Sequence, residues 1–297
     1  MRFAFAGTAP FAELVLTGLA EAGELPCALV TNPDRPRGRH GTPVPPGIKD
    51  LALQRGVLVL QPPRLAEPAD AAALLELAPD VLVACAYGRI VGAGLLAALP
   101  AIVVHPSPVP RWRGAAPVER ALMAGETELG VAILQMTAGV DEGPVGFDQK
   151  VHVPRSADAG EAYVALAPVA VDGVRQVLAA IAAGTVEWRM QEGPASYATK
   201  IGPEDKLIDW SRPAQEIADQ VRALSPHIGA QTELLGRRTR IWRAVAGAGP
   251  LPSPAAGRLA LAAGGGWVDV LELQQEGRTR VTAAEFLRGA GRALAAP

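Results

Sequence analysis

Two polar residues follow extended apolar segments of the chain and together could carry out acid–base chemistry. His105 comes directly after 101–104 (AIVV), and Asp141 heads a turn that follows 130–136 (GVAILQM). If the two strand ends are adjacent, the carboxylate orients the imidazole ring and stabilises positive charge on it. Such a pair suits proton transfer at an acyl group. A histidine past a buried strand is often structural, but the second candidate nearby favours the catalytic interpretation.

Arginines gather at two places where phosphate groups could bind. Arg35, Arg37 and Arg39 lie in a proline-rich loop, NPDRPRGR, that is too stiff for a helix. This loop could be a solvated surface turn, or its arginines could bind phosphate. Arg238 and Arg240 alternate along the basic segment RRTRIWR, so a strand there places both side chains on one face. That spacing indicates contact with a phosphate backbone.

Short apolar segments alternate with helical ones through the first two thirds of the chain. The uninterrupted apolar runs predict strands of a sheet covered on both faces, at 2–6, 27–31, 57–60, 80–86, 101–104 and 130–136. The other segments predict helices, at 9–22, 46–54, 69–77, 91–98, 115–124 and 160–183. The predicted fold class is therefore α/β, a doubly wound, mostly parallel sheet of the Rossmann-like type.

Ligands of such a sheet bind outside the carboxyl ends of its strands. Three of the predicted ends carry suggestive residues: Gly7-Thr8, the run 86–88 (AYG), and His105 with the turn after it. Gly7 alone does not make the G-x-G-x-x-G pattern, so a dinucleotide site is not expected there. A tight turn is the favoured interpretation of Gly7.

The last third of the chain follows a different pattern. A predicted helix near 213–224 precedes short alternating segments separated by glycine- and proline-rich turns, which predict a small, OB-like β-barrel. The segments are 231–235, 238–243, 257–261, 267–273 and 278–281. The predicted division is an α/β domain at 1–184, a linker at 185–205 and the barrel domain at 206–297.

Composition narrows the class of protein further. The 297-residue chain carries 28 basic and 30 acidic side chains, and 49% of its residues are hydrophobic. This balance excludes a wholly basic nucleic-acid coat and an acidic disordered chain. The charge is uneven, because residues 200–297 carry 13 basic and 10 acidic groups, which is compatible with a polyanionic partner. Two cysteines cannot supply a disulfide framework or a four-ligand zinc site, so no metal is expected.

The N-terminus does not read as a secretion signal, because Pro10 and Glu13 interrupt its apolar run. We also expect no membrane span, since the chain lacks the roughly 20 uninterrupted apolar residues that one needs. A soluble cytoplasmic protein is therefore expected, and we also expect it to be a monomer.

Several motifs together resemble the methionyl-tRNA formyltransferases. They are FAGTAPFA, NPDRPRGR, AYG, HPSPVPRWRGAAP, GVAILQM and GVDEGP, followed later by ASYATKI, IDWSRPA, RALSPHIGA and AAEFLRG. The resemblance covers nearly the whole chain, and PRWRGAAP with His105 upstream and Asp141 downstream is its most specific part. The C-terminal motifs distinguish this family from smaller folate-dependent formyltransferases that share only the catalytic domain.

The resemblance implies transfer of a formyl group from 10-formyltetrahydrofolate to the amino group of methionine on the initiator tRNA, a step of translation initiation. His105 would stabilise the oxyanion of the tetrahedral intermediate, and Asp141 would hold His105 and assist proton movement. The substrate amine is the nucleophile, so none is required from the enzyme.

The resemblance also implies two sets of binding residues and no metal. The residues implied in folate binding, largely through their backbone, are Ala86, Tyr87, Gly88, Ser107, Pro108, Val109 and Pro110. The residues implied in tRNA binding are Arg35, Arg37, Arg39, Arg238 and Arg240.

One position departs from the family's Asn-x-His pattern. This sequence has Val103 two residues before His105, and it is a few residues shorter between Pro100 and Ala101. The family's asparagine amide helps to bind the formyl oxygen, whereas valine has no donor. Loss of one oxyanion donor typically lowers the rate about 10²- to 10³-fold. Pro108 replaces the family's usual leucine, which should stiffen the folate turn.

Two alternatives stay open. A formyltransferase that acts on an amino sugar or amino nucleotide shares the catalytic motifs, but the arginine-rich loop and the C-terminal motifs oppose it. A folate- or tRNA-binding homologue with weak or no catalysis is supported by Val103 alone. Salt-sensitive binding of initiator tRNA would argue against the first alternative. Normal binding without transfer would identify the second.

Overall fold

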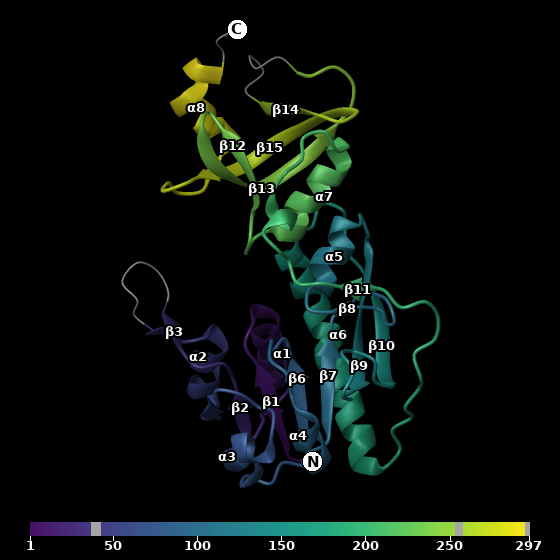
Figure 1. Cartoon of the computed structure of the whole chain (residues 1–297). Helices are drawn as coiled ribbons and strands as arrows, with labels where there is room; N and C mark the ends of the chain where they lie inside the picture. Colours follow the sequence, from purple (N-terminus) through teal and green to yellow (C-terminus); the bar gives the residue numbers. More distant parts are fainter. Residues whose placement is uncertain (37–42, 253–257, 295–297) are drawn as a thin grey trace. The chain divides into compact units, whose positions relative to one another are not determined.

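The computed structural model describes residues 1–36, 43–252 and 258–294. The chain forms two compact units, and each unit draws on three separate stretches of sequence (Figure 1). Unit 1 consists of Met1–Ala115, Leu129–Val151 and Tyr163–Ala198. Unit 2 consists of Ala116–Glu128, His152–Ala162 and Thr199–Pro297.

Unit 1 is built on a seven-stranded sheet with the strand order β10–β9–β7–β6–β1–β2–β5. The strands are β1 (Phe3–Gly7), β2 (Ala28–Val30), β5 (Leu58–Leu60), β6 (Val81–Cys85), β7 (Ala101–His105), β9 (Glu128–Gln135) and β10 (Val145–His152). Pairing is parallel from β5 through β2, β1 and β6 to β7, whereas β9 is antiparallel to β7. The predicted α/β, mostly parallel fold class is confirmed.

The strand order reverses between β1 and β6, and this reversal marks where a ligand of a doubly wound sheet binds. The two strands end in register at Gly7 and Cys85. Gly7 lies in the strand rather than in a tight turn. A Cβ at Gly7 would come within 2.6 Å of the Ala12 Cβ and 3.1 Å of the Cys85 carbonyl oxygen. Glycine is therefore required here for close packing of the first helix on the strand ends.

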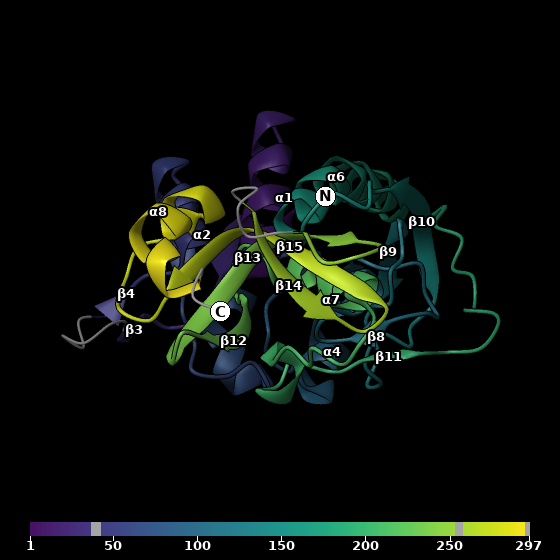
Figure 2. The same ribbon diagram turned by 90° about the horizontal axis from the view of Figure 1, so that it is seen from above.

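Helices cover both faces of this sheet. One face carries α1 (Pro10–Glu21), α2 (Gly47–Gln54) and α6 (Ala159–Ala183), and Figure 2 shows α1 beside α6. The rings of Phe11 and Tyr163 join these two helices, with centroids 5.2 Å apart. The other face carries η1 (Pro68–Ala71), α3 (Ala72–Leu75) and α4 (Ala93–Ala98). Ala71, Leu74 and Leu95 of these helices pack into one buried cluster with alanines of β1, β2 and β6.

α6 is long and apolar enough to span a membrane by length and composition. Its apolar side chains have a different explanation, because it packs on the sheet of unit 1. A Cβ at Gly173 would lie 2.6 Å from the ring of Phe147 and 3.0 Å from Ile133. Such close packing is typical of a core helix.

Two short ribbons complete unit 1. β3 (Arg35–Pro36) pairs with β4 (Pro43–Val44) in antiparallel orientation. β8 (Arg113–Gly114) pairs with β11 (Tyr197–Ala198) in parallel.

Unit 2 contains a five-stranded antiparallel sheet that curves into a half barrel, in agreement with the predicted smaller C-terminal β-barrel domain (Figure 1). Its strands are β12 (Ala230–Leu234), β13 (Arg237–Gly247), β14 (Leu259–Ala263), β15 (Gly266–Gln275) and β16 (Val281–Thr282). Its helices are α5 (Pro117–Met123), η2 (Glu204–Lys206), α7 (Ala214–Leu224) and α8 (Ala283–Leu294). The buried faces of α7 and α8 pack on the sheet through one apolar cluster.

A buried arginine holds the three stretches of unit 2 together. Arg222 of α7 pairs with Asp219 at 2.7 Å. The same guanidinium donates to the carbonyl oxygens of Leu122 (3.3 Å), Glu126 (3.1 Å) and Ala157 (3.5 Å). Removing one partner of such a buried pair typically costs about 3–5 kcal/mol, because the other charge is left uncompensated. These bonds explain why the inserts 116–128 and 152–162 belong to unit 2.

Candidate active site

His105 is the last residue of β7, and its ring is buried, with 4% of its surface exposed. Its Nε2 lies 2.9 Å from the carbonyl oxygen of Trp112. A carbonyl oxygen only accepts hydrogen bonds, so Nε2 carries the proton in this contact. The other nitrogen, Nδ1, faces Asp141, with 3.4 Å between Nδ1 and Oδ2. The structure therefore brings together the two residues that the sequence singles out for catalysis.

Asp141 reaches His105 by a route that differs from the predicted one. The prediction uses two neighbouring strand ends, but β9 runs antiparallel to β7 and pairs Gln135 with Ile102. The end of β9 is thus about three residues, or roughly 10 Å, from His105 along β7. The loop after β9 brings Asp141 back to His105, and the Asp141 Oδ2 also accepts a hydrogen bond from the Gly114 amide at 2.8 Å.

Three residues of this region adopt a left-handed backbone conformation that is unusual for residues other than glycine. Their φ angles are 44° at Ala86, 60° at Trp112 and 53° at Asp141. Such conformations cost about 1–3 kcal/mol each and concentrate at functional sites. Trp112 and Asp141 use this geometry to direct a carbonyl oxygen and a carboxylate at the same imidazole ring.

The turn that follows His105 is closed by its own hydrogen bonds. Ser107 is 2% exposed, and its hydroxyl donates to the Arg111 carbonyl oxygen at 2.7 Å. The Ser107 proton is therefore engaged within the turn. Further along, the Trp112 amide donates to the hydroxyl of Ser196 at 2.9 Å. The segment 189–198, within the predicted linker, thus supports the turn of the site.

Gln191 is a residue of the site that sequence reasoning missed. Its side-chain nitrogen donates to the carbonyl oxygens of Asp141 and Gly143, both at 2.8 Å. Its side-chain oxygen accepts from Arg113, at 2.8 Å and 3.1 Å. One amide side chain therefore ties the Asp141 loop to the ribbon strand β8. No periodic pattern marks this position, and only its neighbourhood of ASYATKI could have directed attention to it.

We expect Gln191→Ala to lower the turnover number of the reaction at this site about 10- to 100-fold, because a small displacement of Asp141 is enough to lose that much. The affinities for both substrates should stay within two-fold of the unmodified protein. Single-turnover kinetics at saturating substrate concentrations measure the effect. Gln149→Ala, at an exposed position of β10, is the matched control. Equal turnover in the two variants would exclude Gln191 from the positioning of Asp141.

The segment 86–88 follows β6 at the reversal of strand order. Tyr87 is 4% exposed, whereas Ala86 and Gly88 are exposed. The Ala86 carbonyl accepts from the Ala9 amide at 3.2 Å, and the Tyr87 carbonyl accepts from the Asn32 side chain at 3.3 Å. Burial raises the pKa of the Tyr87 hydroxyl. The exposed residues Ala86 and Gly88 thus lie at the reversal of strand order, where a ligand of such a sheet binds.

The turn 107–110 lies against β9, the second strand from one edge of the sheet. A Cβ at Gly130 of β9 would come within 3.2 Å of the Pro108 Cβ, so glycine is needed for this approach. Val109 packs in a cluster with Leu134 and Val145. The stiff turn is thus held by packing as well as by its prolines.

Val103 lies on the same face of β7 as His105, because alternate residues of a strand share a face. Its side chain is partly buried and packs against two clusters, one with Ala84 and Ala101 and one with Leu134. An asparagine at this position would direct its amide to the face that His105 occupies.

The predicted tRNA-binding arginines are distributed over both units. Arg35 lies in β3, and Arg37 and Arg39 lie outside the described residues. Arg238 and Arg240 of β13 are exposed on one side of the strand, with Thr239 buried between them. Both line a groove of about 770 Å³ in unit 2, together with Lys206 and several glutamines and glutamates. Within residues 1–36, 43–252 and 258–294, no cluster of three His, Cys, Asp or Glu side chains could hold a metal.

Comparisons with known proteins agree with this arrangement. The family model described as formyl transferase matches residues 1–178, and the one described as formyl transferase, C-terminal domain, matches residues 200–291. The methionyl-tRNA formyltransferase of Thiobacillus denitrificans is 40% identical over 100% of this chain and 98% of its own. That of Symbiobacterium thermophilum is 38% identical over 98% of this chain and 93% of its own.

Among solved structures, HypX from Aquifex aeolicus in complex with tetrahydrofolic acid matches 97% of this chain with a TM-score of 0.68. This chain spans 47% of the length of that protein, and the identity is 18%, so the match shows a common fold. The fold and the two matched models define a formyl transferase. Because the identity to curated relatives extends over both units, the chain belongs to the methionyl-tRNA formyltransferase family.

Proposed function

We propose that this protein transfers the formyl group of 10-formyltetrahydrofolate to the amino group of methionyl initiator tRNA, as a cytoplasmic monomer. The observation that carries the proposal is the buried His105–Asp141 pair, in a chain that matches curated family members over its whole length. As functional divisions we propose 1–184 for catalysis, 185–205 as the linker and 206–297 for tRNA binding.

His105 and Asp141 divide the catalytic work in this proposal. Attack of the substrate amine on the formyl carbon makes the formyl oxygen anionic. The His105 Nε2–H group then donates its hydrogen bond to this oxygen instead of to the Trp112 carbonyl oxygen. This exchange is favourable because a hydrogen bond to an anion is about twice as strong as one to a neutral acceptor. Asp141 lies against Nδ1, stabilises positive charge on the ring and assists removal of the proton that the amine loses. Collapse of the tetrahedral intermediate re-forms the carbonyl and breaks the bond between the formyl carbon and N10 of the folate. N10 takes up the proton, and tetrahydrofolate leaves.

The two substrates occupy separate surfaces in this proposal. The folate binds to the backbone of Ala86, Tyr87, Gly88, Ser107, Pro108, Val109 and Pro110. The acceptor end of the tRNA contacts Arg35, Arg37 and Arg39, and its phosphate backbone enters the groove that Arg238 and Arg240 line.

Transfer of labelled formyl from 10-formyltetrahydrofolate to methionyl initiator tRNA tests the function directly. An amino-sugar nucleotide and uncharged initiator tRNA serve as the comparison substrates. We expect transfer to the methionyl tRNA alone, and binding of the uncharged tRNA that weakens as salt rises. Transfer to the sugar nucleotide without tRNA binding would contradict the proposal. The full-length identity to methionyl-tRNA formyltransferases supports the tRNA over the sugar.

We expect Arg39→Ala to raise the KM for methionyl initiator tRNA and to leave folate affinity unchanged, because the arginine-rich loop is assigned to the tRNA. The change should be about three- to ten-fold, the usual size for one phosphate contact at moderate salt. Steady-state formylation at several salt concentrations measures it. Arg55→Ala, which removes an arginine just after α2, is the control. An unchanged KM for Arg39→Ala would remove the loop from the tRNA site.

A further inference from the structure

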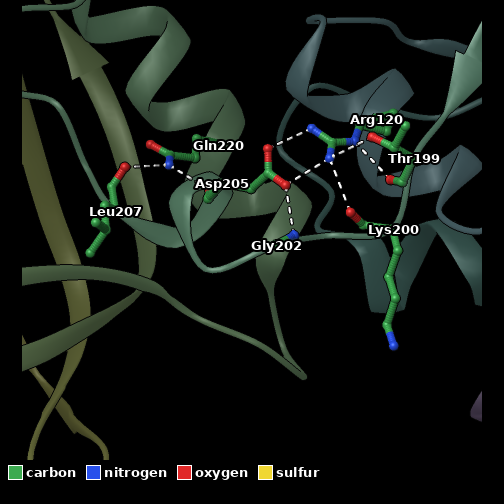
Figure 3. A network of polar contacts seen from close by, with 7 residues as sticks. All are labelled: Arg120, Thr199, Lys200, Gly202, Asp205, Leu207 and Gln220. Carbon is green, nitrogen blue, oxygen red and sulfur yellow. Dashed lines mark hydrogen bonds and ion pairs between the residues drawn. The ribbon is translucent and has the colours of Figure 1, made fainter.

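A hydrogen-bond network in unit 2 holds the segment 199–207 in one conformation (Figure 3). Arg120 of α5 forms a two-pronged ion pair with Asp205, in which both N–O distances are 2.7 Å. The same guanidinium donates to the Thr199 carbonyl (3.0 Å), the Thr199 hydroxyl (3.1 Å) and the Lys200 carbonyl (3.3 Å). One side chain thus binds both ends of the segment.

The segment is also fixed from within and from α7. The Asp205 carboxylate accepts from the Gly202 amide at 2.7 Å. Gln220 of α7 donates to the carbonyl oxygens of Asp205 (2.8 Å) and Leu207 (2.9 Å), as Figure 3 shows. Hydrogen bonds from Arg120 hold the pKa of Asp205 below its usual value, so the carboxylate stays charged near neutral pH. Both partners of the Arg120–Asp205 ion pair are therefore charged near neutral pH.

This segment carries a lysine into the groove of unit 2. Lys206 lines the groove together with Arg238 and Arg240. Two residues later, the Ile208 amide donates to the Gln231 carbonyl on β12 at 2.9 Å, which fixes the segment along the sheet edge. The side chain of Lys200 points away from the network (Figure 3). The backbone that carries Lys206 is thus bonded on both sides.

We propose that Arg120 and Asp205 are positioning residues for the tRNA: they fix the backbone of 199–207 so that Lys206 meets the phosphate backbone as a preorganised cation. The inference rests on the proposed function, because tRNA is the ligand assigned to the groove. Fixing the backbone beforehand removes an ordering cost that binding would otherwise include. The side chains of Arg120 and Asp205 are 20% and 17% exposed. One partly exposed ion pair would fix the backbone only weakly, so we assign the fixing of 199–207 to the whole hydrogen-bond network.

Opposite charge changes test this inference. Arg120→Gln removes a positive charge, and Asp205→Asn removes a negative one. If charge alone acted on the tRNA, the first would weaken binding and the second would strengthen it. Positioning predicts that both raise the Kd for methionyl initiator tRNA about three- to ten-fold and lower the salt slope by up to about one, as Lys206→Gln does. An unchanged or lower Kd for Asp205→Asn would overturn the proposal.

Two further measurements separate positioning from net charge and from misfolding. Arg212→Gln removes an equal charge from unit 2, where Arg212 pairs with Glu216 at 2.7 Å, and its Kd should match that of the unmodified protein. A loss equal to that of Arg120→Gln would contradict positioning. Adding Lys206→Gln to Arg120→Gln should change the Kd little, whereas additive losses would count against a shared mechanism.

Hydrogen exchange without tRNA provides a readout that does not depend on binding. The amides of Gly202 and Leu207 should exchange faster in Asp205→Asn while those of β13 and β15 stay protected. Unchanged exchange at both amides would refute the idea that the pair fixes this backbone. If the unmodified protein bound no tRNA, the proposed function would fail together with this inference. If the unmodified protein bound tRNA normally, but Arg120→Gln weakened binding and Asp205→Asn strengthened it, the positioning role would be wrong and the proposed function would stand.

Discussion

Val103→Asn should raise the turnover number about 10²- to 10³-fold, because it restores a hydrogen-bond donor for the developing oxyanion. Val103 is on the face of β7 that His105 occupies, two residues before it. An asparagine amide at this position can therefore point to the oxygen that His105 also stabilises. The substitution places a polar group against Ala84 and Leu134, so we expect some loss of unfolding free energy, about 1–3 kcal/mol.

The measurement is formylation of methionyl initiator tRNA by both proteins, at saturating concentrations of both substrates. Val104→Asn is the matched control, because Val104 is 2% exposed and lies on the opposite face of the same strand. It should destabilise the protein without any gain in rate. No formyl transfer by the unmodified protein, together with transfer by Val103→Asn, would identify an enzyme weakened at this position. If neither protein transferred the formyl group but both still bound tRNA, the catalytic proposal would be contradicted and a binding homologue would be favoured.

Asp141→Asn should lower the turnover number about 10²- to 10⁴-fold, the usual contribution of a general acid–base group, and leave the fold intact. Both contacts of the carboxylate, from the Gly114 amide and with the His105 Nδ1, use the same oxygen, Oδ2. An asparagine oxygen in that place can still accept from the Gly114 amide, so the loop keeps its position. The variant therefore removes the charge while retaining the geometry.

Single-turnover formylation and thermal unfolding together check this expectation. Asp148→Asn is the control, since Asp148 forms an exposed ion pair with Arg189 in the same unit. Its turnover should equal that of the unmodified protein. Full turnover in Asp141→Asn would show that the charge of Asp141 has no part in the mechanism. A large fall in the unfolding temperature would indicate a structural role instead.

The elements of unit 1 could be predicted because their pattern is local. Uninterrupted apolar runs such as 80–86 and 101–104 become buried central strands, β6 and β7, and the Ala-rich run 160–183 becomes α6. The direction of β9 could not be predicted, because an apolar run fits a parallel or an antiparallel neighbour equally well. His105 and Asp141 therefore lie together as expected, but the predicted route through two adjacent strand ends is wrong.

Non-periodic segments account for what was missed in the site. Gln191 and Ser196 act through backbone partners in other segments, at Asp141 and Trp112. Neither contact leaves a spacing pattern in the sequence. The helix α8 is a different case, since a signal was present. Thr282 and Glu285 form reciprocal hydrogen bonds at its start, and the pattern T-x-x-E before an apolar run marks such a helix start.

The Arg222 network limits how unit 2 can be exchanged between genes. In a protein made from residues 199–297 alone, the Arg222 guanidinium would lack the carbonyl oxygens of Leu122, Glu126 and Ala157, which lie far upstream in the coding sequence. Recombination that appends the last third to a smaller enzyme would therefore yield a poorly folding chimera, unless both upstream inserts came with it. Natural or laboratory exchange of this module is expected to succeed only when all three stretches are transferred together.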